Sequence, residues 1–205
     1  MKAFLVSSLL LALMSSSLPA QKASDYGRQA MEHAKLGEYR AAIAAYEQAI
    51  ALAPQTYKYH YYKGVCQYET SQYEAAIPSF DAALALRPKS AEAYYHRGRC
   101  YFLLDQADKA LADFDKAIAY QAHTGDYFYE RGRCKAALGR HADALADFDR
   151  AIELMPRIGH YYVDRGLSRL ETGDQPGACA DFERAKDMHA FNAGYLWLTH
   201  CNDKP

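Results

Sequence analysis

The chain has 205 residues, half of them hydrophobic, which is enough for one substantial core or a small repeat array and argues against a disordered chain. Its 24 Lys and Arg residues nearly balance its 25 Asp and Glu residues, so no strong net charge points to nucleic acid or to an anionic membrane. The partners must therefore be inferred from local patterns.

Residues 1–20 have the pattern of a cleavable signal peptide. Lys2 supplies a positive charge, the stretch from Ala3 to Leu13 is apolar except for two serines, and Ala20 is a small residue at the expected cleavage site. The apolar stretch is far shorter than the roughly 20 residues needed to cross a bilayer, so a permanent anchor is the weaker alternative. We therefore expect a mature protein of residues 21–205, periplasmic or secreted, with no membrane span.

From residue 23 onward the sequence repeats at a constant interval, which equals the spacing between Gly64 and Gly98. Glycine, alanine, an aromatic residue and a second alanine recur in four columns. The columns are Gly64, Gly98, Gly132 and Gly166; Ala42, Ala76, Ala110, Ala144 and Ala178; Tyr46, Phe80, Phe114, Phe148 and Phe182; and Ala49, Ala83, Ala117, Ala151 and Ala185. Five repeats fill residues 23–56, 57–90, 91–124, 125–158 and 159–192.

Each repeat is predicted to be a pair of helices. In its second half, small, aromatic and small residues at i, i+4 and i+7 lie on one helix face, and the glycine of the first half marks a close approach of a neighbouring helix. Proline ends three repeats, and Gly37, Gly139 and Gly173 lie at turns between paired helices. Helices are expected over residues 24–36, 39–53, 57–70, 73–87, 91–104, 107–121, 125–138, 141–155, 159–172, 175–189 and 193–202.

These columns resemble the tetratricopeptide repeat over residues 23–192, nearly all of the chain that follows the predicted signal peptide. The resemblance implies an all-α fold, a right-handed superhelical solenoid of five helix pairs plus a C-terminal helix within residues 193–205. It also implies that the first helix of each pair lines a concave groove. Proteins of this family are generally scaffolds that hold peptides or partner domains.

Pro78 breaks a local rule, because it falls in the middle of the second helix of the second repeat. A proline there removes a backbone hydrogen bond and costs on the order of 3 kcal/mol unless the helix bends. We therefore expect a bend at Pro78.

The resemblance places several aromatic and basic side chains in the groove. Rings interleaved with arginine suit peptide capture, because they bury area at low entropic cost and add cation–π or bidentate contacts. The candidate peptide-binding residues are Tyr61, Tyr62, Tyr95, His96, Arg99, Phe102, Tyr129 and Arg133. Tyr61, Tyr95 and Tyr129 share one repeat position and would form a ladder. The alternative is that several of these rings pack between repeats.

Some proteins of this family grip a terminal carboxylate with Lys and Asn at positions 5 and 9 of one repeat. In this chain those positions hold Tyr61 and Val65, or Tyr95 and Arg99, so this clamp is not expected.

A second basic column precedes each repeat glycine and is followed by acidic residues 16 positions later in three repeats. Bases and acids occur together, which predicts ion pairs between paired helices rather than a binding patch. As exposed pairs they would contribute about 0–1 kcal/mol each. The expected pairs are Arg97–Asp113, Arg131–Asp147 and Arg165–Asp181.

The five cysteines fall into two groups. Cys66, Cys100 and Cys134 share one repeat position, and stacked repeats are displaced by roughly 8–10 Å, which is too far for a disulfide. We expect these three to be small buried core residues. Cys179 and Cys201 could form a disulfide if the terminal helix packs on the last repeat, and the sequence leaves this open.

Catalytic patterns are missing from the sequence: it has no HExxH, no CxxC and no phosphate-binding glycine-rich loop. His189, His200 and Cys201 could hold a metal, but surface histidines are the commoner explanation, so no catalytic residue, metal or cofactor is predicted. The leading hypothesis is a non-catalytic scaffold for another protein or an extended peptide. The alternative is self-association through the C-terminal helix around Trp197.

Overall fold

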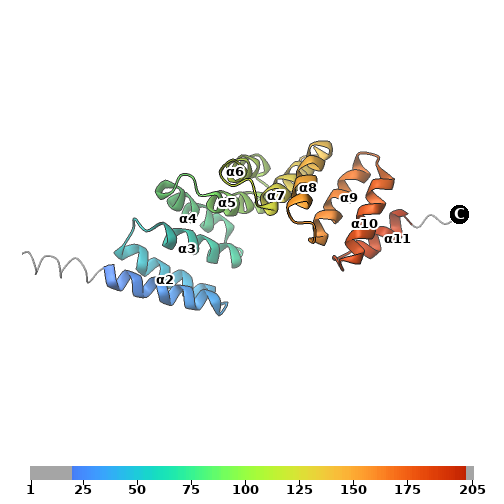
Figure 1. Ribbon diagram of the computed structural model, residues 1–205. Helices are drawn as coiled ribbons and strands as arrows, with labels where there is room; N and C mark the ends of the chain where they lie inside the picture. Colours follow the sequence, from blue (N-terminus) through green and yellow to red (C-terminus); the bar gives the residue numbers. More distant parts are fainter. Residues whose placement is uncertain (1–19, 202–205) are drawn as a thin grey trace, which may run out of the picture. The chain divides into compact units, whose positions relative to one another are not determined.

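The computed structural model describes residues 20–201, and in that range it contains helices and turns but no strand (Figure 1). Its contacts divide the chain into two parts, unit 1 up to His96 and unit 2 from Arg97. The predicted signal peptide lies outside the described residues except for Ala20. No helix in the described range is long and apolar enough to cross a bilayer.

Unit 1 is built from consecutive antiparallel helices. A first helix is described over residues 20–35. It is followed by α2 (Tyr39–Leu52), α3 (Tyr57–Glu69), α4 (Tyr73–Leu86) and the beginning of α5 (Ala91–Leu103). Helix α3 packs against both α2 and α4.

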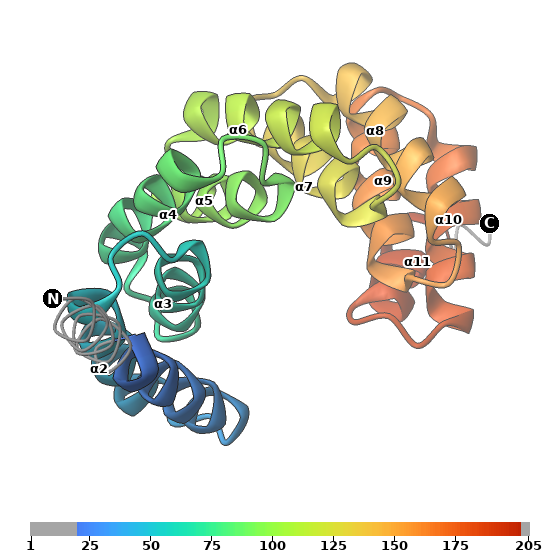
Figure 2. The ribbon, with the colours of Figure 1, turned by 60° about the vertical axis from the view of Figure 1, so that its left-hand side comes forward.

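Unit 2 continues the same arrangement. It contains the remainder of α5, then α6 (Ala107–Tyr120), α7 (Gly125–Ala137), α8 (His141–Leu154), α9 (Gly159–Glu171), α10 (Gln175–Asp187) and α11 (Ala193–Cys201). Each helix from α6 to α10 packs against the next one, and Figure 2 shows α9, α10 and α11 close together near the C-terminus.

The predicted all-α fold of helix pairs is confirmed. From residue 39 onward every helix begins at the predicted residue, and each helix from α2 to α10 ends one or two residues before the predicted end. The remaining difference lies at helix ends, where the last turn loses its regular hydrogen bonds.

The repeat glycine lets the two helices of a pair meet through an aromatic ring. A methyl group on Gly132 would lie 2.8 Å from Cε1 of Phe148, and one on Gly166 would lie 2.6 Å from Cε1 of Phe182. Both rings are fully buried. The sequence predicted a close approach of a neighbouring helix at this glycine, and in the structure the aromatic column makes it. Any larger residue in place of the glycine would push the ring and its helix away.

The turn inside each helix pair uses a left-handed residue. Gly37, Gly139 and Gly173 have φ values of +76°, +73° and +84°, as their position predicts. Ser71 and Asp105 occupy the same repeat position with φ values of 58° and 56°. A side chain in this conformation costs on the order of 1 kcal/mol, so the geometry of the turn is imposed by the packing of the helices.

Helix α4 runs through Pro78 without interruption from Tyr73 to Leu86. Pro78 is exposed, so the carbonyl of Glu74, which loses its helical partner, lies on the solvent side where water can bind it. This placement reduces the cost of the proline. The predicted bend stays a prediction.

The C-terminal helix is fixed to the last repeat. A disulfide joins Cys179 of α10 to Cys201 of α11, with a Cα–Cα distance of 5.5 Å, which settles the pairing that the sequence left open. The Gln175 side-chain amide donates to the carbonyl of His200 at 2.8 Å, and Nζ of Lys186 lies 4.3 Å from the Trp197 ring centroid. Because Cys201 is in the disulfide, it is not available as a thiolate ligand for a metal.

The other three cysteines are free and buried, as predicted. Burial raises the pKa of Cys66 to about 11, of Cys100 to about 12 and of Cys134 to about 11. Since the thiolate is the reactive form, these side chains are protected from alkylation and oxidation in the folded protein.

Cysteine labelling tests this assignment. Iodoacetamide added to the denatured, unreduced protein is expected to modify three cysteines, and five after reduction. Reduction should also lower the free energy of unfolding by about 3 kcal/mol, the value for a loop of this length. Mass spectrometry and urea unfolding measure both quantities, and five labelled cysteines before reduction would contradict the disulfide.

Candidate functional site

The predicted ion pairs between paired helices are present. Nε and Nη2 of Arg131 bind the two carboxylate oxygens of Asp147 at 3.0 and 2.5 Å. Arg97–Asp113 and Arg165–Asp181 repeat this bidentate geometry. We expected these pairs to be exposed, but their carboxylates are buried: Asp147 is 3% exposed and Asp181 is 2% exposed. Leaving either carboxylate without its arginine would therefore cost far more than losing a surface pair.

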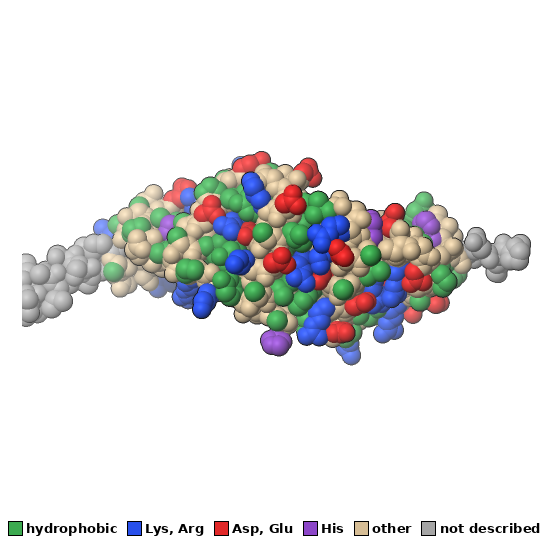
Figure 3. Space-filling view, turned by 90° about the horizontal axis from the view of Figure 1, so that it is seen from above, with side chains coloured by type: hydrophobic (Ala, Val, Ile, Leu, Met, Phe, Trp, Pro, Cys, Tyr) green, Lys and Arg blue, Asp and Glu red, His purple; other side chains and the backbone are tan. Residues whose placement is uncertain are grey.

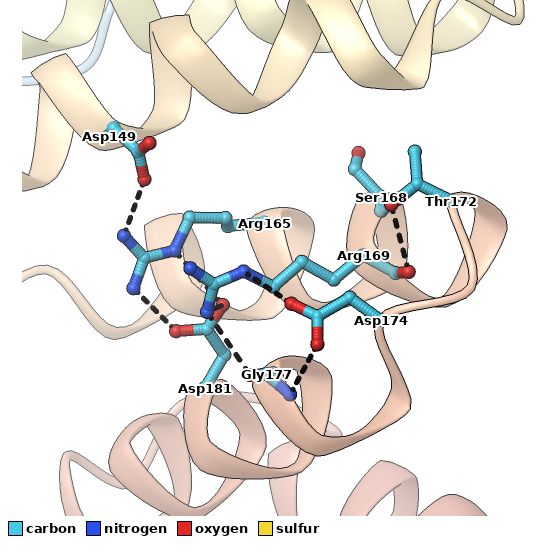
Figure 4. Close-up of polar contacts among 8 residues, drawn as sticks. All are labelled: Asp149, Arg165, Ser168, Arg169, Thr172, Asp174, Gly177 and Asp181. Atoms are coloured by element: carbon cyan, nitrogen blue, oxygen red, sulfur yellow. Dashed lines mark hydrogen bonds and ion pairs between the residues drawn. The ribbon is translucent and has the colours of Figure 1, made fainter.

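The same arginines also connect neighbouring repeats. Nη1 of Arg131 lies 2.8 Å from Asp115. Nη1 of Arg165 lies 2.7 Å from Asp149, the contact that Figure 4 shows. Lys63 contacts Glu47 in the same way at 2.9 Å. Arg131 and Arg165 thus lie 16 residues after the acid of the preceding repeat. They also lie 16 residues before the aspartate of their own repeat. Only the second spacing entered the prediction, although the sequence contains both.

Further hydrogen bonds complete this network. Lys135 lies 2.7 Å from Asp147, and Arg169 lies 2.8 Å from Asp181. In the second repeat a neutral pair takes the equivalent place, where Ser79 donates to Gln67 at 2.6 Å. Acidic and basic side chains accordingly lie side by side on the face shown in Figure 3. The bases of this column are therefore paired with acids of the chain itself and are not available to bind a ligand.

A double-mutant cycle on Arg131 and Asp147 tests this role. Asp147→Ala should lower the free energy of unfolding by about 3–5 kcal/mol, because the part-buried cations of Arg131 and Lys135 lose the carboxylate that they share. The coupling energy should exceed that of the exposed pair Arg140–Asp143, which should be about 0–1 kcal/mol. Equal coupling in the two cycles would show that burial does not strengthen the inner pair.

The candidate residues of unit 2 surround one buried carboxylate. Glu130 is 6% exposed, and Arg133 donates to it at 3.0 Å while Nε of Arg99 lies 3.5 Å away. The Arg133 guanidinium also lies 5.1 Å from the centroid of Phe102. Both predicted groove arginines are therefore held by an acid of the chain itself.

Tyr129 is not an open groove residue, contrary to the ladder hypothesis. Its side chain is 9% exposed, its ring stacks 4.6 Å from that of Tyr161, and its hydroxyl donates to Asp164 at 2.7 Å. The ring is closed in because α9 packs on α7 at this level. The alternative interpretation, rings packed between repeats, describes Tyr129 better.

The pKa of Glu130 tests how deeply this network is buried. Burial raises the pKa of Glu130 above its ordinary value of 4.5, against the attraction of Arg133 and Arg99. The folded chain then binds more protons than the unfolded chain, so this residue lowers the free energy of unfolding as pH rises from about 4.5.

In the Glu130→Gln variant the free energy of unfolding should rise more steeply, or fall less steeply, with pH in that window. Urea unfolding between about pH 4 and 6.5 measures the slope. An unchanged slope would contradict a raised pKa.

The candidate residues of unit 1 divide between core and surface. The His96 ring stacks 5.8 Å from Phe80, and its edge lies 5.8 Å from Tyr61 and 5.2 Å from Tyr95. His96 therefore belongs to an aromatic cluster that continues into the core. Tyr95 is half-buried, whereas Tyr62 is 39% exposed and available to a ligand.

Tyr61 and Tyr62 line a pocket of about 770 Å³, which we call the α3 cleft. It lies between the first turns of α3 and the connection from α4 to the start of α5. Its lining residues are Tyr57, Lys58, Tyr61, Tyr62, Arg87, Pro88, Lys89, Ser90 and Glu92.

The aromatic wall of the α3 cleft is held in place by its own contacts. The rings of Tyr57 and Tyr61 stack at 5.6 Å, and Tyr62 meets Tyr61 edge-on at 5.1 Å. The hydroxyls of Tyr57 and Ser90 are hydrogen bonded at 2.7 Å, and burial raises the pKa of Tyr57. The guanidinium carbon of Arg87 lies 4.4 Å from the Tyr57 ring centroid. Little reorganisation is needed for binding, which lowers its cost.

Tyr57, Arg87 and Lys89 were not among the residues predicted from the sequence. A signal was present for Tyr57 and Arg87, because both depart from the repeat: the position of Tyr57 holds Ala91, Gly125 and Gly159 elsewhere, and that of Arg87 holds Gln121, Met155 and His189. Helix stacking does not require a tyrosine or an arginine at these positions, because the other repeats stack without them. These side chains can therefore serve binding.

Paired helices in equal repeats, joined by buried arginine–aspartate contacts, define an α-helical repeat protein with an aromatic cleft. Models of the tetratricopeptide repeat match residues 28–86, 67–127 and 125–158, more than half of the chain in total. The chain belongs to the tetratricopeptide repeat family.

Solved structures agree with this fold. A crystal structure of the protein MamA is 24% identical, with a TM-score of 0.76, covering 85% of this chain and 96% of that one. MamA from Desulfovibrio magneticus RS-1 is 19% identical, with a TM-score of 0.78 and coverages of 82% and 95%. YrrB, described as a tetratricopeptide repeat protein with an unusual peptide-binding site, is 21% identical, with a TM-score of 0.72 and coverages of 85% and 89%. Comparison with curated proteins gives no match.

Proposed function

We propose that the protein is a non-catalytic scaffold that binds another polypeptide, and that the α3 cleft is a binding site for an extended segment of it. The observation that carries the proposal is a preformed aromatic wall beside exposed basic side chains. Membership of a family of binding scaffolds supports it, and so does the similarity to YrrB, which has a peptide-binding site.

The size and chemistry of the α3 cleft suit a few side chains of a peptide. Its volume of about 770 Å³ falls within the usual range of ligand pockets. Tyrosine rings bury a large area at small entropic cost, and their hydroxyls remain able to bind a polar backbone. The eight groove candidates do not act as one surface in this proposal, because the arginines of unit 2 are engaged by Glu130.

The proposed location is the periplasm or the outside of the cell. The signal-peptide pattern of residues 1–20 supports this location. The disulfide between Cys179 and Cys201 also supports it, because disulfides persist in oxidising compartments.

Self-association is the second candidate function. Near the C-terminus, Phe191 is 86% exposed, Tyr195 is 68% exposed and Leu198 is 60% exposed. Three large apolar side chains so close in sequence could bury one another between two copies. Trp197 contributes less to such a contact than expected, since Lys186 lies over its ring.

Selection from a random peptide library displayed on phage tests the scaffold proposal. The protein should enrich a family of related peptides, and Tyr62→Ala should weaken their binding by about tenfold or more, because it removes an exposed ring of the wall. Tyr120→Ala is the matched control, a tyrosine of α6 with 40% exposure outside the cleft, and should bind like the original protein.

Failure to enrich any peptide family, or equal binding by Tyr62→Ala, would contradict the proposed site. Sedimentation at several protein concentrations separates the two candidate functions. A constant molecular mass supports the scaffold, whereas a mass that rises with concentration and returns to that of the monomer on Leu198→Asp supports self-association.

A further inference from the structure

We infer that the α3 cleft selects acidic peptide segments, with carboxylates bound by Lys58, Arg87 and Lys89 and an apolar or aromatic side chain against the tyrosine wall. This inference rests on the proposed function and specifies its ligand. It is based on a comparison of ion pairs in the part of the chain that the structure describes: the bases of the repeat columns have acidic partners there, whereas the bases of the α3 cleft have none.

The three basic side chains of the α3 cleft have no acidic partner. Lys58, Arg87 and Lys89 are all exposed, and within residues 20–201 no carboxylate lies within ion-pair distance of any of them. Basic residues of the repeat columns are different: Lys63, Arg131 and Arg165 each contact at least one acid. The lining therefore carries cations whose charge is left for a ligand.

The single acid of the lining does not neutralise them. Glu92 accepts a hydrogen bond from Ser90 at 3.2 Å, and Ser90 is in turn hydrogen bonded to Tyr57. Three cations against one carboxylate leave a formal charge of +2 in the lining (3 − 1 = 2). An anionic segment would be attracted, and a basic one repelled.

Arg87 is positioned to bind a carboxylate. Its guanidinium is placed by the ring of Tyr57, at 4.4 Å, and a cation–π contact consumes none of its N–H donors. A guanidinium presents these donors in a planar fork that matches the two oxygens of a carboxylate. Lys58 and Lys89 add exposed point charges, whose effect on binding is screened by salt.

The ring arrangement favours a peptide over a single-stranded nucleic acid. Stacking of bases requires an open ring face, but Tyr57 lies against Tyr61 and is in contact with Arg87, and Tyr61 is also met edge-on by Tyr62. The chain as a whole also lacks the excess of basic residues that a polyanion requires. Short acidic segments with an apolar residue fit the wall and the charges together.

Fluorescence anisotropy with synthetic peptides tests the inference. The probes are a peptide selected in the phage experiment, a variant of it with Asp and Glu at every position outside its apolar residue, and the same variant with Asn and Gln. The acidic variant should bind about tenfold more tightly than the amide variant, since charge-assisted hydrogen bonds replace neutral ones. Raising KCl from about 50 to 500 mM should remove most of this preference.

Matched charge variants show whether the cleft is responsible. Arg87→Gln with Lys89→Gln should abolish the preference for the acidic peptide. Lys35→Gln with Arg40→Gln changes the net charge equally, at exposed positions of unit 1 outside the cleft, and should preserve it. Circular dichroism and urea unfolding establish that both variants fold.

The outcomes separate the two proposals. If both peptides bind equally, or the control variant loses the preference as fully as the cleft variant, the charge selection is wrong while the scaffold function stands. If no peptide binds, both fail. If an oligothymidine of matched charge or vesicles containing anionic lipid displace the acidic peptide at lower concentration, the cleft is a general polyanion site and the inference is overturned.

Discussion

The contact between a glycine of one helix and an aromatic ring of the next is the constraint on which the rest of the structure depends. At Gly64, Gly98, Gly132 and Gly166 the ring comes so close that a single methyl group would not fit. Because that space is full, the small and aromatic columns are fixed by packing and cannot vary with function. Specific binding must then come from residues outside the columns, and the α3 cleft consists of such residues.

Charged residues also divide into those of the repeat columns, which take part in packing, and those outside the columns. Arginines of the repeat column each bind a buried aspartate within their own repeat, and Arg131 and Arg165 also contact an acid of the preceding repeat. Such pairs give little net stability compared with apolar packing, but they fix which helix faces which. Their regular recurrence explains why they resemble a basic binding stripe in the sequence. The three cations of the α3 cleft lie outside these columns.

Sequence periodicity predicted most of the fold because the packing is local. Helix α3 contacts α2 and α4, and each helix from α6 to α10 contacts the next one, so a fixed spacing such as that of Gly132 and Phe148 predicts which residues meet. The pairing of Arg131 with Asp147 was predictable for the same reason. Their burial was not, since exposure depends on the neighbouring repeat and not on the pair alone.

The candidate site was predicted less well, because a repeat position does not fix the environment of a side chain. Tyr61 and Tyr129 share one position, yet Tyr61 lines the α3 cleft and Tyr129 is closed in beside Tyr161. The cleft also draws on Arg87, which lies at the end of α4 and was not considered as a groove residue. Its contact with Tyr57 joins the two ends of one repeat, and no periodic pattern indicates it.

The disulfide between α10 and α11 has a consequence for how this array can change in evolution. Helix α11 begins at Ala193, one full repeat length after Gly159 begins α9, so it takes the place of the first helix of another repeat. A copy added directly after α10 would separate Cys179 from Cys201 and displace the helix that covers the last pair. An array lengthened at this end therefore keeps its closing bond only if the repeat next to α11 has a cysteine at the position of Cys179, which holds Ile43, Ile77, Leu111 and Leu145 in the other repeats.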